Sequence, residues 1–128
     1  ITEKEQYYSP HVPKIVFNQD KPNRSGLLRY ISRAPIPAVK EGYDWPEGNV
    51  WKQVCIYGFK WWHLESFAKQ KEKTTLEFVE DIEILRFVEM GIAVRMIMIE
   101  GSPMSVDTEE DLQKADALAR KLNPNFWK

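Results

Sequence analysis

Residues 14–32, KIVFNQDKPNRSGLLRYIS, decide the fold because two apolar runs are separated by a dense group of turn-forming residues. The first run predicts a strand over residues 14–18, and LLRYIS predicts a second strand over residues 27–32. The proline, asparagine and glycine residues between the runs favour a turn. This stretch therefore predicts an antiparallel hairpin.

The segment after the hairpin predicts a long loop and then a buried strand. Pro35 and Pro37 end the second hairpin strand, and residues 39–53 hold two glycines, one proline and two tryptophans. Loops of this length in compact domains are usually functional or mobile. Residues 54–59, VCIYGF, form a continuous apolar run that is typical of a buried strand. Cys55 within this run is expected to be a small buried hydrophobic residue.

The second half of the chain predicts helices that alternate with a strand. The expected elements are helices over residues 61–70, 75–90 and 108–122 and a strand over residues 93–100. Thr74 and Glu77 match a capping box at the start of the middle helix, and Gly91 is a natural stop at its end. Together with the hairpin, this order predicts an α/β fold with a mixed sheet and flanking helices.

Length and composition indicate one ordinary soluble domain. The 128 residues are 43% hydrophobic and 29% charged, which argues against disordered and fibrous classes. The net charge of -1 provides no field that would attract nucleic acid or an anionic membrane. No apolar run approaches the ~18 residues of a membrane-spanning helix. The single cysteine suits a reducing cytoplasm.

Four carboxylates crowd into residues 107–111, and three of them have a structural explanation. Thr108 and Asp111 match a capping box, and the two glutamates between them fall in the first helical turn. The helix dipole favours negative charge there by roughly 0.3–1 kcal/mol each. Asp107 precedes the cap and is not needed by the helix. It is either a solvated turn residue or a ligand for Mg²⁺, which commonly uses one or two carboxylates.

Glu83 interrupts an apolar row of the helix predicted over residues 75–90, because Val79 and Phe87 lie one turn away on either side. Burying an unpaired charge is costly, so Glu83 must pair, reach solvent or face a polar ligand. A pair with Arg86 at i+3 is the structural alternative. Neither histidine lies beside other metal-ligating residues, so no metal or catalytic role is expected for them.

Four stretches resemble a known family in their order and spacing. They are KIVFNQDKPNRSGLLRYISRAPIP at 14–37, KQVCIYGF at 52–59, TTLEFVEDIEILRFVEMG at 74–91 and SVDTEEDLQKA at 105–115. Over about residues 8–120, the sequence resembles the C-terminal half of 3-deoxy-manno-octulosonate cytidylyltransferase, also called CMP-Kdo synthetase. Four consecutive matches are much more specific than any one alone.

The resemblance implies a fold and an activity. Such enzymes have an α/β, Rossmann-like nucleotidyltransferase fold, are usually homodimers and need Mg²⁺. They join a sugar acid to CTP with release of pyrophosphate, and the anomeric hydroxyl attacks the α-phosphate in line. Chemistry of this kind depends on positioning and on neutralising phosphate charge. The resemblance therefore implies CTP, a sugar acid and Mg²⁺ as ligands, and a homodimer as the assembly.

The resemblance also implies roles for individual residues. Asp107 matches the aspartate of the VDTPED motif, which binds Mg²⁺ and takes part in catalysis with an aspartate of the N-terminal half. Arg33 matches the arginine of SRATIP, which borders the sugar-acid pocket. Tyr57 matches the first tyrosine of IYGY, and Glu83 matches a glutamate that faces the sugar. Gln53 stands at a substrate-facing position where the family commonly has histidine.

Two departures from the family pattern bear on the substrate. The amide of Gln53 can still donate and accept hydrogen bonds, but Ile84, which stands where the family has glutamine, cannot. A sugar acid other than Kdo, such as a nonulosonic acid of the sialic type, is therefore an open alternative. Glu109 replaces the proline of VDTPED, which is a harmless change in a first helical turn.

The nucleotide-binding half of the family has no counterpart in this sequence. We expect residues 1–128 to be a single domain, the C-terminal portion of a longer enzyme that carries sugar-binding, metal and dimerisation elements. Without the other half, the chain is expected not to bind CTP productively and to be inactive. The competing interpretation is a non-catalytic dimerisation or regulatory module that kept the scaffold.

Overall fold

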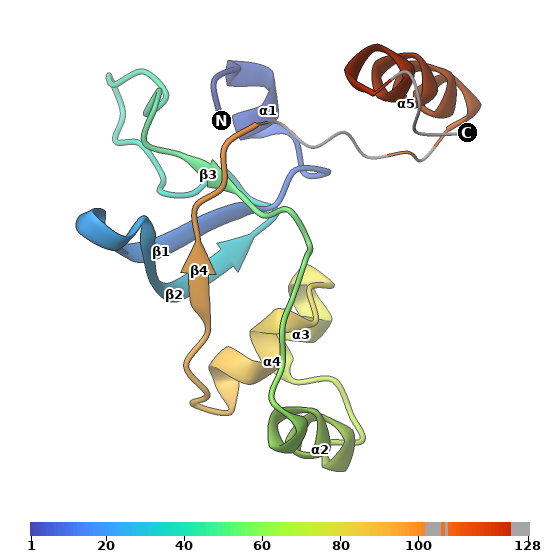
Figure 1. Ribbon diagram of the computed structural model, residues 1–128. Coiled ribbons are helices and arrows are strands. Elements are labelled where there is room, and N and C mark those ends of the chain that lie inside the picture. The colour runs from blue at the N-terminus through green and yellow to red at the C-terminus, as the bar shows by residue number, and fades with distance from the viewer. Residues whose placement is uncertain (102–105, 107, 124–128) are drawn as a thin grey trace. The chain divides into compact units, whose positions relative to one another are not determined.

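The computed structural model describes residues 1–101, 106 and 108–123, and its contacts divide the chain into two compact units (Figure 1). The first unit is Ile1–Met98 and the second is Ile99–Lys128. The first unit contains the sheet and all helices but one. The two units are described separately.

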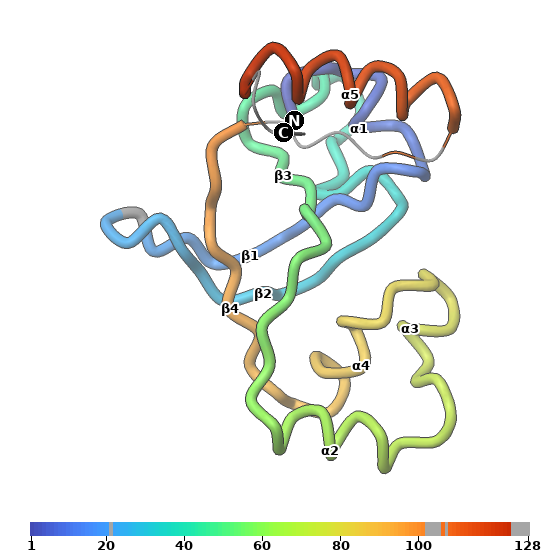
Figure 2. Tube along the Cα trace, turned by 45° about the vertical axis from the view of Figure 1, so that its right-hand side comes forward, coloured from blue at the N-terminus to red at the C-terminus, as the bar shows by residue number. Residues whose placement is uncertain are grey.

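An antiparallel hairpin lies at the centre of the first unit, as predicted. Strand β1 (Lys14–Asp20) is joined through the short helix η1 (Lys21–Asn23) to β2 (Ser25–Ser32). The register places Lys14 opposite Ser32 and Asp20 opposite Ser25. Both views show β1 and β2 running side by side (Figure 2).

Two shorter strands complete the sheet. Strand β3 (Trp51–Lys52) pairs with β1, and β4 (Arg95–Ile97) pairs with β2, which gives the order β3-β1-β2-β4. Every pairing in this sheet is antiparallel. The strand predicted over residues 93–100 is therefore present but shorter.

Gly26 allows β1 and β2 to approach closely. A Cβ atom at this position would collide with the carbonyl oxygen of Asn18 and with the ring of Phe17. The hairpin therefore requires a residue without a side chain here.

Helices lie beside the sheet, so the mixed α/β class is confirmed. The first unit contains α1 (Lys4–Tyr8), α2 (Trp61–Lys69), α3 (Thr75–Glu80) and α4 (Ile84–Glu89), and the second contains α5 (Glu109–Leu122). The core joins the hairpin to α4 and the turn before it through Ile15, Leu28, Ile31, Ile82, Ile84, Leu85 and Phe87. None of the helices described is both long and apolar enough to cross a membrane.

The single helix predicted over residues 75–90 is wrong, because it is broken into α3 and α4. Asp81 adopts left-handed backbone angles, φ 52° and ψ 52°, and ends α3. The guanidinium of Arg33 donates to the carbonyls of Glu80 and Asp81, which replaces helical hydrogen bonds at this end. A tertiary contact therefore overrides a continuous helical pattern.

The predicted helix ends were more accurate than the helix interior. The capping box of Thr74 and Glu77 is present, and the capping box of Thr108 and Asp111 begins α5. At the end of α4, Gly91 has φ 73° and its N–H donates to the carbonyl of Val88 at 3.0 Å. The N–H of the following residue donates to Phe87, which completes a Schellman motif.

The buried strand predicted over residues 54–59 is also wrong. This segment belongs to no strand, and Cys55 is exposed with a positive φ of 59°. Cys55 is therefore not the small buried residue that the apolar run suggested. Figure 1 shows the segment as a green connection between β3 and α2.

Candidate functional site

Arg33 follows the last residue of β2, and its side chain is fixed by three backbone carbonyls. Its Nε donates to Glu80 at 2.6 Å, while Nη1 and Nη2 donate to Pro10 and Asp81, each at 3.2 Å. A guanidinium carries five N–H donors. The other two have no hydrogen-bond partner among the residues described. Arg33 is therefore a preorganised cation with donors still available.

Glu80 holds the backbone on which Arg33 stands. Its carboxylate accepts hydrogen bonds from the Ser32 hydroxyl at 2.6 Å, the Arg33 N–H at 2.8 Å and the Tyr30 hydroxyl at 3.1 Å. Burial favours a higher pKa for Glu80, but these hydrogen bonds and the Arg33 charge outweigh it and lower the pKa. Glu80 is thus held as a carboxylate.

Sequence analysis missed Glu80, although one signal was available. Glu80 closes a helix, where the dipole disfavours negative charge and a carboxylate needs a compensating partner. The position of the helix end was itself mispredicted, so this signal could not be used.

A buried lysine lies beneath the same backbone and was also missed. The side chain of Lys14 is fully buried, and its Nζ donates to the carbonyls of Arg33 at 2.6 Å and Ser9 at 2.7 Å. Burial lowers the pKa of Lys14, against the opposite influence of the Glu80 charge. Arg33 is therefore held through both its side chain and its backbone carbonyl.

Gln53 and Tyr57 are joined by a hydrogen bond outside the sheet. The Tyr57 hydroxyl donates to Gln53 Oε1 at 2.7 Å. Burial, followed by electrostatic interactions with Cys55 and Glu83, raises the pKa of Tyr57 to about 12. Tyr57 is therefore a neutral hydroxyl near neutral pH, and its oxygen can still accept a hydrogen bond.

Glu83 is exposed in the turn between α3 and α4, directly before Ile84. The predicted alternative, an ion pair with Arg86, is wrong because Arg86 binds Glu77 instead. Glu83 reaches solvent, and its charge acts on Tyr57. Arg33, separately, donates to the carbonyls of Glu80 and Asp81 directly before this turn.

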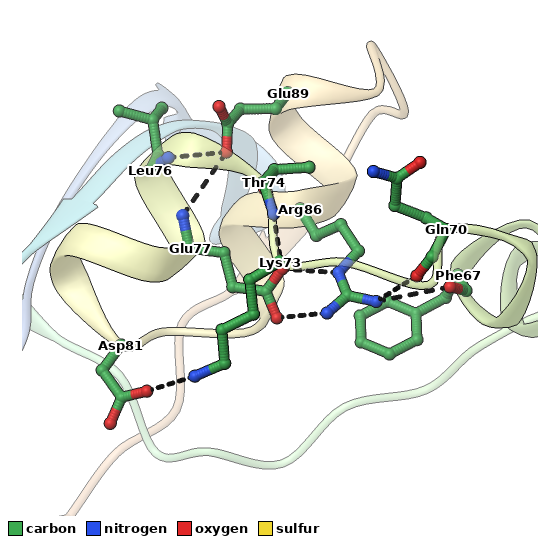
Figure 3. A network of polar contacts seen from close by, with 9 residues as sticks. All are labelled: Phe67, Gln70, Lys73, Thr74, Leu76, Glu77, Asp81, Arg86 and Glu89. Atoms are coloured by element: carbon green, nitrogen blue, oxygen red, sulfur yellow. Dashed lines mark hydrogen bonds and ion pairs between the residues drawn. The ribbon is translucent and has the colours of Figure 1, made fainter.

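The turn that carries Glu83 is supported by a polar network (Figure 3). Arg86 Nε donates to Glu77 Oε2 at 2.5 Å, and Nη2 donates to Oε1 at 2.6 Å. On the other side of α3, Glu89 accepts the N–H of Leu76 at 2.9 Å. Lys73 pairs with Asp81 at 2.6 Å on the surface. These contacts fix α4 against α3 and so fix the turn between them.

Ile84 does not face an open site. Its side chain is only 4% exposed and belongs to the hydrophobic core. The inference that Ile84 changes a sugar-facing position is therefore wrong, because the isoleucine packs inward from the first turn of α4. This removes one argument for a different sugar acid.

Asp107 lies outside the described residues, so its predicted role in catalysis and in Mg²⁺ binding stays a prediction. Within the part of the chain that the structure describes, no three histidine, cysteine or carboxylate side chains are grouped in a way that could hold a metal ion. The described residues alone therefore do not fit a complete magnesium site.

Comparisons with known proteins agree on one group of enzymes, although no protein-family model matches the chain. The chain is 40% identical over 99 residues to 3-deoxy-manno-octulosonate cytidylyltransferase of Rickettsia prowazekii, covering 77% of this chain and 37% of that enzyme. It is 35% identical over 129 aligned positions to the same enzyme of Stenotrophomonas maltophilia, covering 95% and 48%. This chain is a relative of the 3-deoxy-manno-octulosonate cytidylyltransferases.

A solved structure supports the relationship to these cytidylyltransferases. CMP:2-keto-3-deoxy-manno-octonic acid synthetase complexed with CTP superimposes with a TM-score of 0.78 at 25% identity. The match covers 94% of this chain and 46% of that one. The chain thus spans less than half the length of the cytidylyltransferases it matches, and the family resemblance and the fold class are both confirmed.

The side chains described above are suited to binding a polar, anionic ligand. By themselves they do not form the machinery of a chemical reaction. Arg33 offers fixed N–H donors, Tyr57 and Gln53 offer neutral donors and acceptors, and Glu83 offers an acceptor. The described residues therefore offer fixed donors and acceptors for a polar ligand.

Proposed function

We propose that this chain supplies the sugar side of a cytidylyltransferase that joins 3-deoxy-manno-octulosonate, or a related sugar acid, to CTP and releases pyrophosphate. The observation that carries the proposal is Arg33, whose side chain is fixed by the Pro10 carbonyl and by two carbonyls at the turn that also carries Glu83. The activity for which the relatives are named and the CTP in the solved structure support it.

In this proposal Arg33 binds the carboxylate of the sugar acid. Guanidinium and carboxylate form charge-assisted hydrogen bonds, and a side chain already held in place loses little entropy when the ligand arrives. The hydroxyl of Tyr57 and the amide of Gln53 bind sugar hydroxyls, and Glu83 accepts from another. This combination orients the sugar so that one hydroxyl is presented to the nucleotide.

Asp107 is proposed as a ligand of Mg²⁺ and as a catalytic residue. A bound Mg²⁺ would neutralise phosphate charge and bring nucleotide and sugar oxygens together. Because the described residues do not complete a metal site, the other ligands would come from the nucleotide phosphates, from water and from the nucleotide-binding half.

The complete enzyme is proposed to be a cytoplasmic homodimer in which a nucleotide-binding half accompanies this chain. That half would bind CTP, so these 128 residues alone would release no pyrophosphate. The coverage of less than half of each relative supports this division of labour.

The test uses a hybrid enzyme, in which this chain replaces the matched residues of the Rickettsia prowazekii relative. With CTP, Mg²⁺ and a panel of sugar acids, pyrophosphate release should be highest with 3-deoxy-manno-octulosonate. Asp107→Asn should reduce turnover by about 100-fold or more, as expected for the loss of a metal ligand. The matched control is Glu110→Gln, which removes a carboxylate in the first turn of α5 that pairs with Lys114 on the surface.

Two results would remove the proposal. Full turnover by Asp107→Asn at ordinary Mg²⁺ would exclude the metal role, and equal turnover by Arg33→Ala would exclude the sugar-binding role. If the chain is a non-catalytic interaction module, neither Asp107→Asn nor Arg33→Ala should affect turnover. Preference for a nonulosonic acid in the panel would keep the reaction and change the substrate.

A further inference from the structure

The main chain of Arg33 is hydrogen-bonded by charged side chains instead of by the sheet. Strand β2 ends at Ser32, so Arg33 is the first residue beyond it. The N–H of Arg33 donates to Glu80 Oε2 at 2.8 Å, and its C=O accepts from Lys14 Nζ at 2.6 Å. Hydrogen bonds in which one partner is ionised are stronger than those between neutral groups. Both polar groups of the Arg33 main chain are therefore firmly held.

Glu80 and Arg33 also exchange hydrogen bonds in both directions. The carboxylate of Glu80 binds the main chain of Arg33, and the Nε of Arg33 donates to the main-chain carbonyl of Glu80 at 2.6 Å. The two residues are 47 positions apart and join the end of β2 to the end of α3. This reciprocal pair fixes the position of the Arg33 backbone and the direction of its side chain together. The two N–H donors of Arg33 that have no described partner therefore point in a set direction.

The two charged groups that hold Arg33 are themselves fixed. Glu80 Oε1 accepts from the Ser32 hydroxyl at 2.6 Å and from the Tyr30 hydroxyl at 3.1 Å, so both carboxylate oxygens are engaged. The side chain of Lys14 is fully buried, and its Nζ donates to a second main-chain carbonyl at 2.7 Å. Neither group is free to contact a ligand without breaking these bonds.

Stability alone is a weak explanation for placing these charges here. Removing a charge from water is costly, and well-packed apolar side chains often replace buried ion pairs without loss of stability. Lys14 and Arg33 are cations and Glu80 is an anion, so the three groups together retain one positive charge. That excess charge is suited to an anionic ligand such as the carboxylate of a sugar acid.

We propose that Glu80 and Lys14 are positioning residues for the sugar acid and that both act through Arg33. This inference rests on the proposed function, because it takes the carboxylate of the sugar acid as the ligand of Arg33. A guanidinium and a carboxylate form two parallel hydrogen bonds only when their planes and distances match. A displacement of the main chain at Arg33 would move its free donors away from that geometry.

The first test titrates the hybrid enzyme with 3-deoxy-manno-octulosonate in a calorimeter, without CTP. Glu80→Ala should raise the Kd of the sugar acid by about tenfold or more, the loss expected when a charge-assisted hydrogen bond is misaligned. Glu80→Gln keeps an oxygen that can accept the Arg33 N–H, so it should recover part of the affinity. The matched control is Asp44→Ala. It removes a carboxylate that likewise accepts a main-chain N–H and joins segments 40 residues apart, and it should leave the Kd unchanged.

The second test asks whether Glu80 acts through Arg33. In an Arg33→Ala background, Glu80→Ala should change the Kd by less than about twofold, because changes that share one partner are not additive. Lys14→Met, made in both backgrounds, gives a second cycle that serves if Glu80→Ala does not fold. An equal rise in Kd in both backgrounds would show that the residue acts independently of Arg33 and would overturn the inference. Unchanged affinity in Glu80→Ala and Lys14→Met would do the same.

Turnover at saturating sugar acid is measured on the same samples. Glu80→Ala should raise the KM for the sugar acid and leave kcat within about twofold, because only binding is weakened. A lower kcat with an unchanged Kd would contradict a positioning role. If the Kd values follow the expected pattern but no pyrophosphate is released, the positioning role stands and the proposed reaction is removed. If Arg33→Ala binds the sugar acid normally, both are removed.

Discussion

Arg86 and Glu77, nine residues apart, face each other through two hydrogen bonds in the interior between α3 and α4. The Glu77 side chain is 1% exposed and the Arg86 side chain 10% exposed. The guanidinium also lies over the ring of Phe67, 3.8 Å from its centroid. Glu83 is nearer to Arg86 in the sequence, but Arg86 pairs with the buried Glu77.

Removing one member of this pair should strongly destabilise the fold. Glu77→Gln leaves the buried Arg86 charge without its counter-charge, so the free energy of unfolding should fall by about 3–5 kcal/mol. Urea denaturation of the isolated chain measures this change. The matched control is Asp81→Asn, which breaks the exposed ion pair with Lys73 and should change stability little. Equal effects of the two substitutions would contradict the assignment.

The same pair predicts an acid-sensitive stability. The hydrogen bonds from Arg86 are the main cause of the lowered pKa of Glu77, whose ordinary value is 4.5. Because the folded pKa is depressed, the contribution is full above pH 4.5 and is lost as pH falls through the folded value. Denaturation midpoints between neutral pH and acid should therefore fall more steeply for the unmodified chain than for Glu77→Gln. If the denaturation midpoints of the two proteins fall in parallel as the pH is lowered, the Glu77 carboxylate is not the source of the acid sensitivity.

Arg33 should stabilise the fold even without a ligand, because two of its hydrogen bonds tie the α3 to α4 turn to the end of β2 and a third holds the Pro10 carbonyl. Arg33→Lys keeps the charge but loses the planar fork, and unfolding should become easier by about 1.5–3 kcal/mol. Arg29→Lys, on the exposed side of the same strand, is the matched control and should be neutral. If both variants unfold at the same urea concentration, the bonds to the carbonyls are not stabilising.

Gly26 should tolerate no side chain, whereas Gly58 should. Gly26→Ala places a Cβ against the Asn18 carbonyl and should cost about 1–3 kcal/mol, through the strand displacement that overpacking causes. A Cβ at Gly58 meets nothing within 4 Å, so Gly58→Ala should leave the thermal midpoint of the isolated chain nearly unchanged. A neutral Gly26→Ala would show that the hairpin is looser than its register indicates.

Local sequence signals predicted the parts of the fold that depend on local chemistry. The hairpin, the capping residues Thr74 and Thr108 and the stop at Gly91 each follow from a few neighbouring residues, and the structure confirms them. The break at Asp81 could not be predicted from the local sequence, because it depends on the guanidinium of Arg33, which lies 48 residues earlier in the chain.

The candidate site shows the same division. The resemblance selected Arg33, Gln53, Tyr57 and Glu83; the structure joins Tyr57 to Gln53 and ties Arg33 to Asp81, and their role in binding stays a prediction. Glu80 and Lys14 were missed because their role is to hold Arg33, and no short pattern marks residues that act through another. The apolar run at 54–59 misled the strand prediction because an apolar run does not by itself supply a neighbouring strand, and the described residues provide none.

The ring of Phe87 in α4 stacks with Phe59 at 5.2 Å and with Phe67 of α2 at 5.3 Å. The ring of Phe87 therefore joins the segment before α2 to α2 itself. A lateral displacement of Phe59 has to be absorbed by the middle ring, and a close-packed interior leaves it little room to do so. Any displacement of Phe59 therefore has a short route to α2, through stacked rings and without any change in the sheet.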